Sequence, residues 1–142
     1  MTNNKKKKKK PIFEKVGLVF RNPVRADIMK ELESKPQRAI DLQENIGVPK
    51  QNINYHLNAL KKGGLVQTHK KEVDELETLS EELPSTRGVR INGVSKKGKL
   101  KVSYGVELTE NGKNVVEQFI NPLYEKQDTA NEKNDKKKTK KK

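Results

Sequence analysis

Cysteine is absent from this 142-residue chain, and its absence excludes disulfide bonds, thiolate metal ligands and thiol redox chemistry. Tryptophan is also absent, and no apolar run approaches the roughly 20 residues that a membrane-spanning helix needs. The lysine-rich start could be mistaken for the charged part of a signal peptide, but the apolar stretch after it is short and is broken by Glu14, Lys15 and Gly17. We therefore expect a soluble, cytoplasmic protein.

Hydrophobic residues make up only 30% of the chain and the formal net charge is +13, values that would indicate disorder if they were evenly spread. They are not evenly spread. Residues 1–10 contain six lysines and no acid, and residues 126–142 contain eight lysines against three acids, so the two ends carry +11 of the charge. The sequence predicts disordered basic tails at 1–10 and 126–142, with one compact domain at 11–125.

Four helices are expected in the first half of the domain. Apolar residues recur at helical spacing over 12–20, and Asn22-Pro23 is a helix start, with asparagine as N-cap and proline in the first turn. That helix should end near Ser34, before Pro36. A third helix from residue 39 should end at Gly47, and a fourth should run from about 49 to 62, where two glycines stop it.

The two faces of the helix expected at 49–62 differ in chemistry. Because successive helical residues are about 100° apart, Ile53, Leu57 and Leu60 fall within roughly 40° of one another and form an apolar seam. The outer face holds amides, a tyrosine and lysines, and no acid occurs between Pro49 and Lys62. Such a face suits the major groove of DNA, because DNA is a polyanion with base edges to read. The alternative is an ordinary solvent-facing surface.

Two neighbouring segments of opposite charge follow. Residues 72–82 contain six acids and no base, and Val73, Leu76, Leu79 and Leu83 are spaced as one side of a short helix. This acidic insertion, at about 72–86, is interpreted as a solvated helix between two strands or as an internal mimic of DNA. Residues 87–101 contain six bases and no acid and alternate apolar with basic residues around a turn at 95–98, which predicts a β-hairpin with a basic tip.

A last helix should begin at Thr109 and carry two apolar stripes, listed as Val115, Phe119, Leu123 and Val116, Ile120, Tyr124. Two stripes exceed what one contact needs, so one could pack on the core and the other on a partner. We expect Pro122 to kink this helix or to shorten it to about Asn121. The apolar surplus in Ile12–Phe20 and Val115–Tyr124 predicts a homodimer through these segments.

Several segments resemble the ArsR-like winged helix-turn-helix transcription regulators. They are Phe20-Arg-Asn-Pro-Val-Arg-Ala-Asp-Ile-Met, Asp41-Leu-Gln-Glu-Asn-Ile-Gly-Val, Ile53-Asn-Tyr-His-Leu-Asn-Ala-Leu-Lys-Lys-Gly-Gly-Leu-Val and Tyr104-Gly-Val-Glu-Leu-Thr-Glu-Asn-Gly-Lys. The resemblance implies a mainly helical α+β winged helix, with an enlarged wing region and flanking terminal helices, acting as a homodimeric, sequence-specific regulator. It places base contacts at Lys50, Gln51, Asn52, Asn54 and Tyr55. At His56 it implies either a phosphate contact or a half-buried residue that orients its neighbours.

The predicted function is therefore sequence-specific binding of double-stranded DNA in transcription regulation, with a nucleoid-associated location in the cytoplasm. The predicted DNA-binding residues are Lys50, Gln51, Asn52, Asn54, Tyr55, His56, Asn58, Lys62, Arg87, Arg90, Lys96, Lys97 and Lys99. The alternatives are a non-specific chromatin-type DNA-binding protein and a winged helix used as a protein–protein interaction module. The sequence shows no phosphate loop, catalytic constellation or metal-ligand spacing, so we expect no enzyme activity, no cofactor, no metal and no membrane contact.

Overall fold

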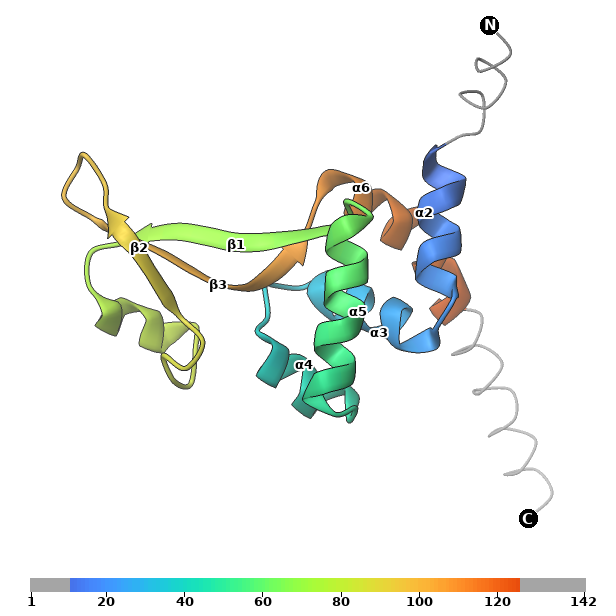
Figure 1. The fold of residues 1–142 in the computed structure, drawn as a ribbon, viewed down its shortest axis with the longest axis horizontal. Coiled ribbons are helices and arrows are strands. Elements are labelled where there is room, and N and C mark those ends of the chain that lie inside the picture. The colour runs from blue at the N-terminus through green and yellow to red at the C-terminus, as the bar shows by residue number, and fades with distance from the viewer. Residues whose placement is uncertain (1–10, 126–142) are drawn as a thin grey trace, which may run out of the picture.

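The computed structural model describes residues 11–125, and the two basic tails predicted at 1–10 and 126–142 lie outside the described residues. The first half is helical, with α2 (Pro11–Phe20), α3 (Pro23–Leu32), α4 (Ala39–Ile46) and α5 (Lys50–Lys62). Figure 1 shows these helices gathered on one side, while a sheet extends away from them as an arm. No helix within residues 11–125 is long and apolar enough to cross a membrane.

The helix ends follow the signals in the sequence. The Asn22 side chain accepts a hydrogen bond from the Val24 amide at 2.9 Å, which caps α3. Gly47 ends α4 with a φ of 82°, a left-handed conformation that glycine adopts without strain. Pro49 stands one position earlier than expected, as the N-cap of α5, and no side chain caps that end.

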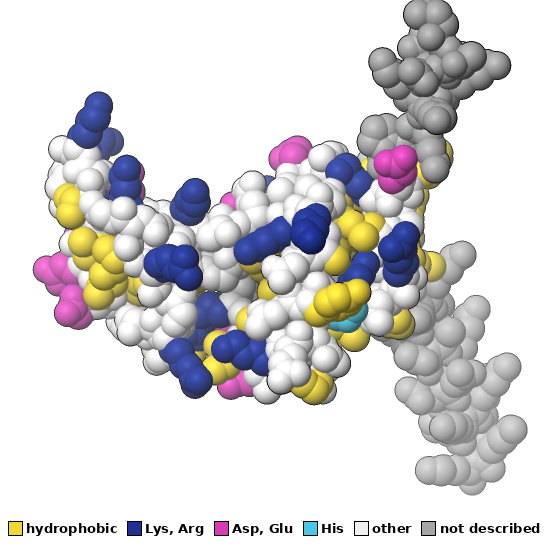
Figure 2. All heavy atoms as spheres, in the orientation of Figure 1, with side chains coloured by type: hydrophobic (Ala, Val, Ile, Leu, Met, Phe, Trp, Pro, Cys, Tyr) yellow, Lys and Arg dark blue, Asp and Glu magenta, His cyan; other side chains and the backbone are white. Residues whose placement is uncertain are grey.

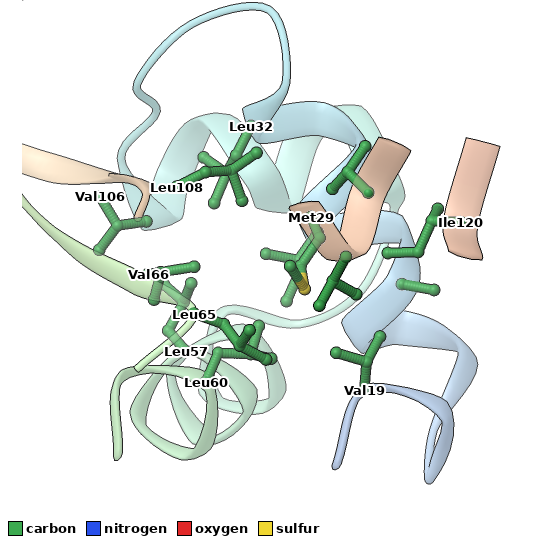
Figure 3. Packing of buried hydrophobic residues seen from close by; sticks show 14 of the residues in the cluster. Val19, Met29, Leu32, Leu57, Leu60, Leu65, Val66, Val106, Leu108 and Ile120 are labelled. Carbon is green, nitrogen blue, oxygen red and sulfur yellow. The ribbon is translucent and has the colours of Figure 1, made fainter. Parts of the chain in front are cut away.

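The main core lies between the helices and the near end of the sheet (Figure 3). Ile53 and Leu60 are fully buried and Leu57 is 6% exposed, so the predicted seam of α5 is confirmed. Burying one such side chain contributes about 1.5–3 kcal/mol relative to leaving it in water. The seam packs with residues from α3 and with Leu65 and Val66, which follow α5 directly. The orientation of α5 about its own axis is set by this packing.

Three antiparallel strands form the sheet in the order β1-β3-β2: β1 (Val66–Val73), β2 (Arg90–Val94) and β3 (Leu100–Leu108). The hairpin predicted over 87–101 is present, and its turn is closed by a bond from the Ser95 amide to the Lys99 carbonyl at 2.7 Å. The second strand of this hairpin continues past residue 101 to Leu108 as one strand, β3. Helix-turn-helix and sheet together make a winged helix, as predicted.

The acidic insertion joins β1 to β2 through a 3-10 helix, η1 (Leu76–Glu81). Its apolar residues Leu79 and Leu83 pack with Val73, Val102 and Tyr104 in a second, smaller core at the far end of the sheet. The shared apolar side was predicted correctly, although Val73 belongs to β1. The insertion thus packs on one face of the sheet as a bridge between strands.

The last helical segment begins with α6 (Glu110–Val115), which Thr109 caps by accepting from the Gly112 amide at 3.1 Å. It continues as a π-helical turn, η2 (Val116–Ile120), and stays helical over 121–125. The expectation that Pro122 ends the helix near Asn121 is therefore wrong. A π turn widens the backbone just before the proline, which lacks an amide proton and crowds the preceding turn.

This segment has two apolar stripes. One is mostly buried, and the other has both a buried and an exposed residue. Val116 and Ile120 are buried in the main core, and the Tyr124 hydroxyl donates a hydrogen bond to Asp27 on α3. In the other stripe Val115 is buried, whereas Leu123 is 47% exposed. Part of the apolar surplus therefore remains at the surface.

Gly105 lets β3 pass close to the start of the helix-turn-helix. Its φ is 60°, and Gln37 exchanges two backbone hydrogen bonds with the next residue, Val106, at 2.9 and 3.1 Å. A Cβ atom at Gly105 would lie 2.2 Å from the Gln37 carbonyl oxygen. The sheet and the helical part are joined at this contact.

We predict that Gly105→Ala lowers the free energy of unfolding by at least about 2 kcal/mol, because it adds backbone strain and a steric overlap. The control is Gly17→Ala in α2, where a Cβ meets open space and helix propensity adds about 0.5–1 kcal/mol of stability. Urea denaturation measures both. Equal stabilities for the two variants would contradict the role assigned to Gly105.

Candidate nucleic-acid interface

The outward face of α5 is polar and accessible. Tyr55 is 66% exposed, and the other predicted contact residues on this helix, apart from His56, are exposed as well: Lys50, Gln51, Asn52, Asn54, Asn58 and Lys62. Because Ile53, Leu57 and Leu60 hold the opposite side in the core, these side chains form one continuous surface. Seven of the thirteen predicted contact residues are thus exposed on α5.

The end of α5 is fixed by close packing against α2. A Cβ at Gly63 would lie 2.2 Å from the end of the Leu18 side chain, which would have to shift to admit it. The Lys15 ammonium donates to the Gly63 carbonyl at 2.6 Å, which places a cation at the negative end of the helix. The position of α5 is therefore tied to α2 as well as to the core.

A buried arginine links α2, α3 and α5. Arg25 is 6% exposed; its Nε donates to His56 Nδ1 at 3.0 Å, and its Nη1 donates to the Leu18 carbonyl at 2.9 Å. The guanidinium carbon also lies 5.9 Å from the centre of the Tyr55 ring, which meets the His56 ring edge-on at 5.2 Å. Arg25 therefore positions Tyr55 on the outward face. The sequence offered no signal for this contact, since residues 25 and 56 are far apart in the chain.

His56 is buried beside Arg25. It is 7% exposed and accepts the Arg25 hydrogen bond, so it does not belong to the outward face of α5. Burial, followed by the charge of Arg25, lowers the pKa of His56 below its usual 6.5. The neutral ring is the form that can accept from Arg25.

The wing presents a second basic surface. Lys96 and Lys97 are exposed at the tip of the β2–β3 hairpin, where Ser95 stabilises the turn by accepting from the Lys99 amide at 3.1 Å. Lys99 itself lies 3.9 Å from Asp74 of the insertion, so the fold brings an acid to a hairpin that has none in its own sequence. The two tip lysines are thus more available for a phosphate than Lys99.

Arg38 anchors the entry to the hairpin. It is 5% exposed, and its Nη1 donates to the Arg87 carbonyl at 2.7 Å and to the Ser85 carbonyl at 3.2 Å. Its Nε and Nη2 each donate to Asp41 at 2.9 Å. Burial raises the pKa of Asp41, but the hydrogen bonds from Arg38 outweigh it and leave the pKa below its usual value. Through Arg38 the start of α4 holds the loop before β2, while the Arg87 and Arg90 side chains stay exposed.

Lysine and arginine side chains spread from α5 across the sheet to the wing tip on the face shown in Figure 2. Acidic side chains gather at the left edge below the wing, where Figure 1 places η1. Within residues 11–125, no three His, Asp or Glu side chains are grouped so that they could hold a metal ion. The arrangement provides a polar helix face with a basic wing beside it.

Residues 21–69 match a family model described as a helix-turn-helix domain. The matched segment contains α3, α4 and α5 and ends within β1. No curated protein matches the chain. Helix-turn-helix domains are DNA-binding modules, so the match supports a DNA-binding regulator without distinguishing ArsR-like regulators from others.

The buried His56 should make folding sensitive to acid. Below about pH 6.5 the unfolded chain binds a proton at this residue that the folded chain resists, so the free energy of unfolding falls as the pH falls. Replacing it by glutamine keeps an acceptor for Arg25 and removes the titration. We expect urea denaturation between about pH 7 and pH 5 to show a steeper loss for the natural chain than for His56→Gln. Parallel curves would rule out a neutral, buried His56.

Proposed function

We propose that this protein is a sequence-specific, double-stranded DNA-binding transcription regulator that inserts α5 into the major groove. The observation that carries the proposal is the division of α5 into a buried seam and an outward face without an acid. The major groove is about 12 Å wide and admits a helix of about 10–12 Å diameter. Residues 11–125 would form the DNA-binding domain, with 1–10 and 126–142 as basic tails.

The amides on this face suit adenine. Glutamine and asparagine side chains pair with adenine through two hydrogen bonds in the major groove, with the amide donating to N7 and accepting from N6. Gln51, Asn52, Asn54 and Asn58 are all exposed on α5. We therefore propose an A·T-rich target site. Tyr55, held by Arg25, supplies an exposed ring beside these amides.

The basic residues would contribute to the affinity for DNA but not to its sequence specificity. Lys50 and Lys62 lie at the two ends of α5, and Lys96 and Lys97 lie at the wing tip. Contacts from such residues to phosphates fix the register of a protein on the duplex and release counterions, which makes binding weaker as salt rises. Arg87, Arg90 and Lys99 complete this basic set, with Lys99 partly neutralised by Asp74.

The outer face of α5 also bears on the alternative of a protein-interaction module. Tyr55 is the one large hydrophobic residue on α5 that is exposed among the described residues. Protein interfaces need an apolar patch at their centre, and amides and lysines do not supply one. A non-specific chromatin-type protein would use the same basic residues, and it is separated from a regulator by its lack of sequence preference.

We further propose that the protein acts as a homodimer through the segments 12–20 and 115–124. Phe20 on α2 is 41% exposed and Leu123 is 47% exposed, on two segments that already pack with the same core. An interface of this kind would cover both side chains with the corresponding segments of a second copy. A two-fold dimer would bind two half-sites about one helical turn of DNA apart.

We predict that Asn54→Ala weakens binding to a site selected from random DNA by about 1–3 kcal/mol and leaves binding to a random duplex nearly unchanged. The control is Asn111→Ala, an exposed asparagine on α6 outside the proposed interface. Binding-site selection followed by fluorescence anisotropy measures both. A G·C-rich selected site, or equal losses for the two variants, would count against reading by α5.

The dimer is tested by Leu123→Glu, which places a charge in the proposed interface. We expect the natural chain to sediment as a dimer and the variant as a monomer with unchanged helical content, because a charge cannot be buried there unpaired. Asn111→Glu adds the same charge at an exposed site outside these two segments and should remain dimeric. A natural chain that sediments as a monomer would refute the dimer.

A further inference from the structure

The far part of the sheet has two very different faces. One face carries Val73, Val102 and Tyr104, which the insertion covers. The other face is open and hollow. Its lining includes Glu72, Asn92 and Ser103 and the cations Lys70, Arg90 and Lys101, together with Val102 and with Lys71, which is paired with Glu82. We call this surface the open-face hollow.

Strand register places the cations around a small polar floor. Lys70 on β1 and Arg90 on β2 both pair with Ser103 on β3, so the three side chains point to the same side of the sheet. Adjacent strands are about 4.8 Å apart, so the Cα atoms of Lys70 and Arg90 are roughly 10 Å apart across Ser103. Lys101, two residues before Ser103, lies on the same face. Ser103 has a short side chain that is only 8% exposed, and it forms the base of the hollow.

Glu72, which pairs in register with Lys101, offsets only part of the charge of these three cations. In the described part of the chain, no ion pair or side-chain hydrogen bond involves Lys70, Arg90 or Lys101, although Glu72 lines the same hollow. On the covered side the opposite holds, since Lys71 contacts Glu82 at 2.5 Å. Glu82 also accepts from the Tyr104 hydroxyl at 2.6 Å.

The acidic insertion therefore separates charge across the sheet. Its carboxylates pair with Lys71 and approach Lys99, while the open-face hollow keeps a net charge of two positives from its three cations and Glu72. Like charges held together without a partner repel one another. Such an arrangement is matched by a ligand that brings several negative charges at close spacing.

We propose that the open-face hollow holds the sugar–phosphate backbone of the duplex whose bases α5 reads. This inference rests on the proposed function. Duplex DNA presents one negative charge per roughly 1.7 Å of its axis, which suits cations on three neighbouring strands. The hollow has no aromatic ring on which an unpaired base could stack, and it has no large apolar anchor for a protein partner.

The hollow is also rigidly connected to α5. Leu65 and Val66 at the start of β1 are packed in the same core as the seam of α5, and β1 continues directly to Lys70. Figure 1 shows β1 leaving the end of α5 as an extended arm. The hollow therefore lies on a strand whose start is packed against α5, and not on a loop.

The first test measures salt dependence with the full chain and a 30-base-pair duplex of random sequence, because phosphate contacts carry no sequence information. The variant is Lys70→Gln with Lys101→Gln. The matched control, Lys35→Gln with Lys113→Gln, removes the same charge from exposed lysines at the cleft beside α6. We expect the slope of log K against log salt to become less steep by about one to two in the variant and to stay nearly constant in the control.

The second test uses the absence of natural cysteine. A single cysteine at Asn92, in the hollow, or at Ser34, in the cleft near α6, carries an iron chelate that cleaves nearby DNA backbone. We expect backbone cleavage of a bound selected site from position 92 and none from position 34.

Three results separate the proposals. If the natural chain fails to bind any duplex, both the proposed function and the proposed role of the hollow are refuted. If Asn54→Ala loses specific binding while Lys70→Gln with Lys101→Gln keeps the natural salt slope, the regulator stands and the hollow is overturned. If position 92 cleaves no better than position 34, the hollow is overturned as well. Thermal unfolding of each variant confirms that it is folded.

Discussion

Burial of the seam on α5 is the constraint on which the interface depends. Ile53 and Leu60 are fully buried and Leu57 nearly so, and together they fix the rotation of the helix. Turning α5 by one residue, about 100°, would remove these side chains from the core and bury amides and lysines in their place. The face that remains outside is therefore determined by the core. Its chemistry, amides with lysines and no acid, is what the proposed reading of DNA uses.

Two buried arginines extend this constraint to the neighbouring elements. Arg25 joins the end of α2 to His56 and places Tyr55, and Arg38 joins the start of α4 to the loop before β2. Buried charges need hydrogen-bond partners, and within residues 11–125 no buried side-chain nitrogen or oxygen lacks one. On the covered side of the sheet, Glu82 of the insertion pairs with Lys71, whereas Lys70, Arg90 and Lys101 on the open side make no ion pair within residues 11–125. Packing in the core fixes α5, the hydrogen bonds of the two arginines connect it to α2, α4 and the loop before β2, and ion pairing on the covered face leaves cations exposed on the sheet.

Much of this fold could be predicted from the sequence because its signals are local. The N-cap Asn22, the stop at Gly47, the seam and the hairpin turn each depend on residues within one or two turns of one another. Contacts between distant residues could not be predicted. Nothing in the sequence pairs Arg25 with His56 or Arg38 with Arg87. The continuity of β3 and the π turn before Pro122 depend on tertiary packing. The open-face hollow requires the strand register, which Gly105 and its bulge shift by one residue.

The central claim is that α5 reads sequence and does not merely attach to phosphate. Competition at physiological salt tests this most directly. The protein is bound to a labelled duplex that contains a site selected from random DNA. The competitor is either the same duplex without the label or an unrelated unlabelled duplex of equal length. The account predicts that the selected site competes at least about a thousandfold better, the lower end of the range for specific regulators. Equal competition by both duplexes would contradict it.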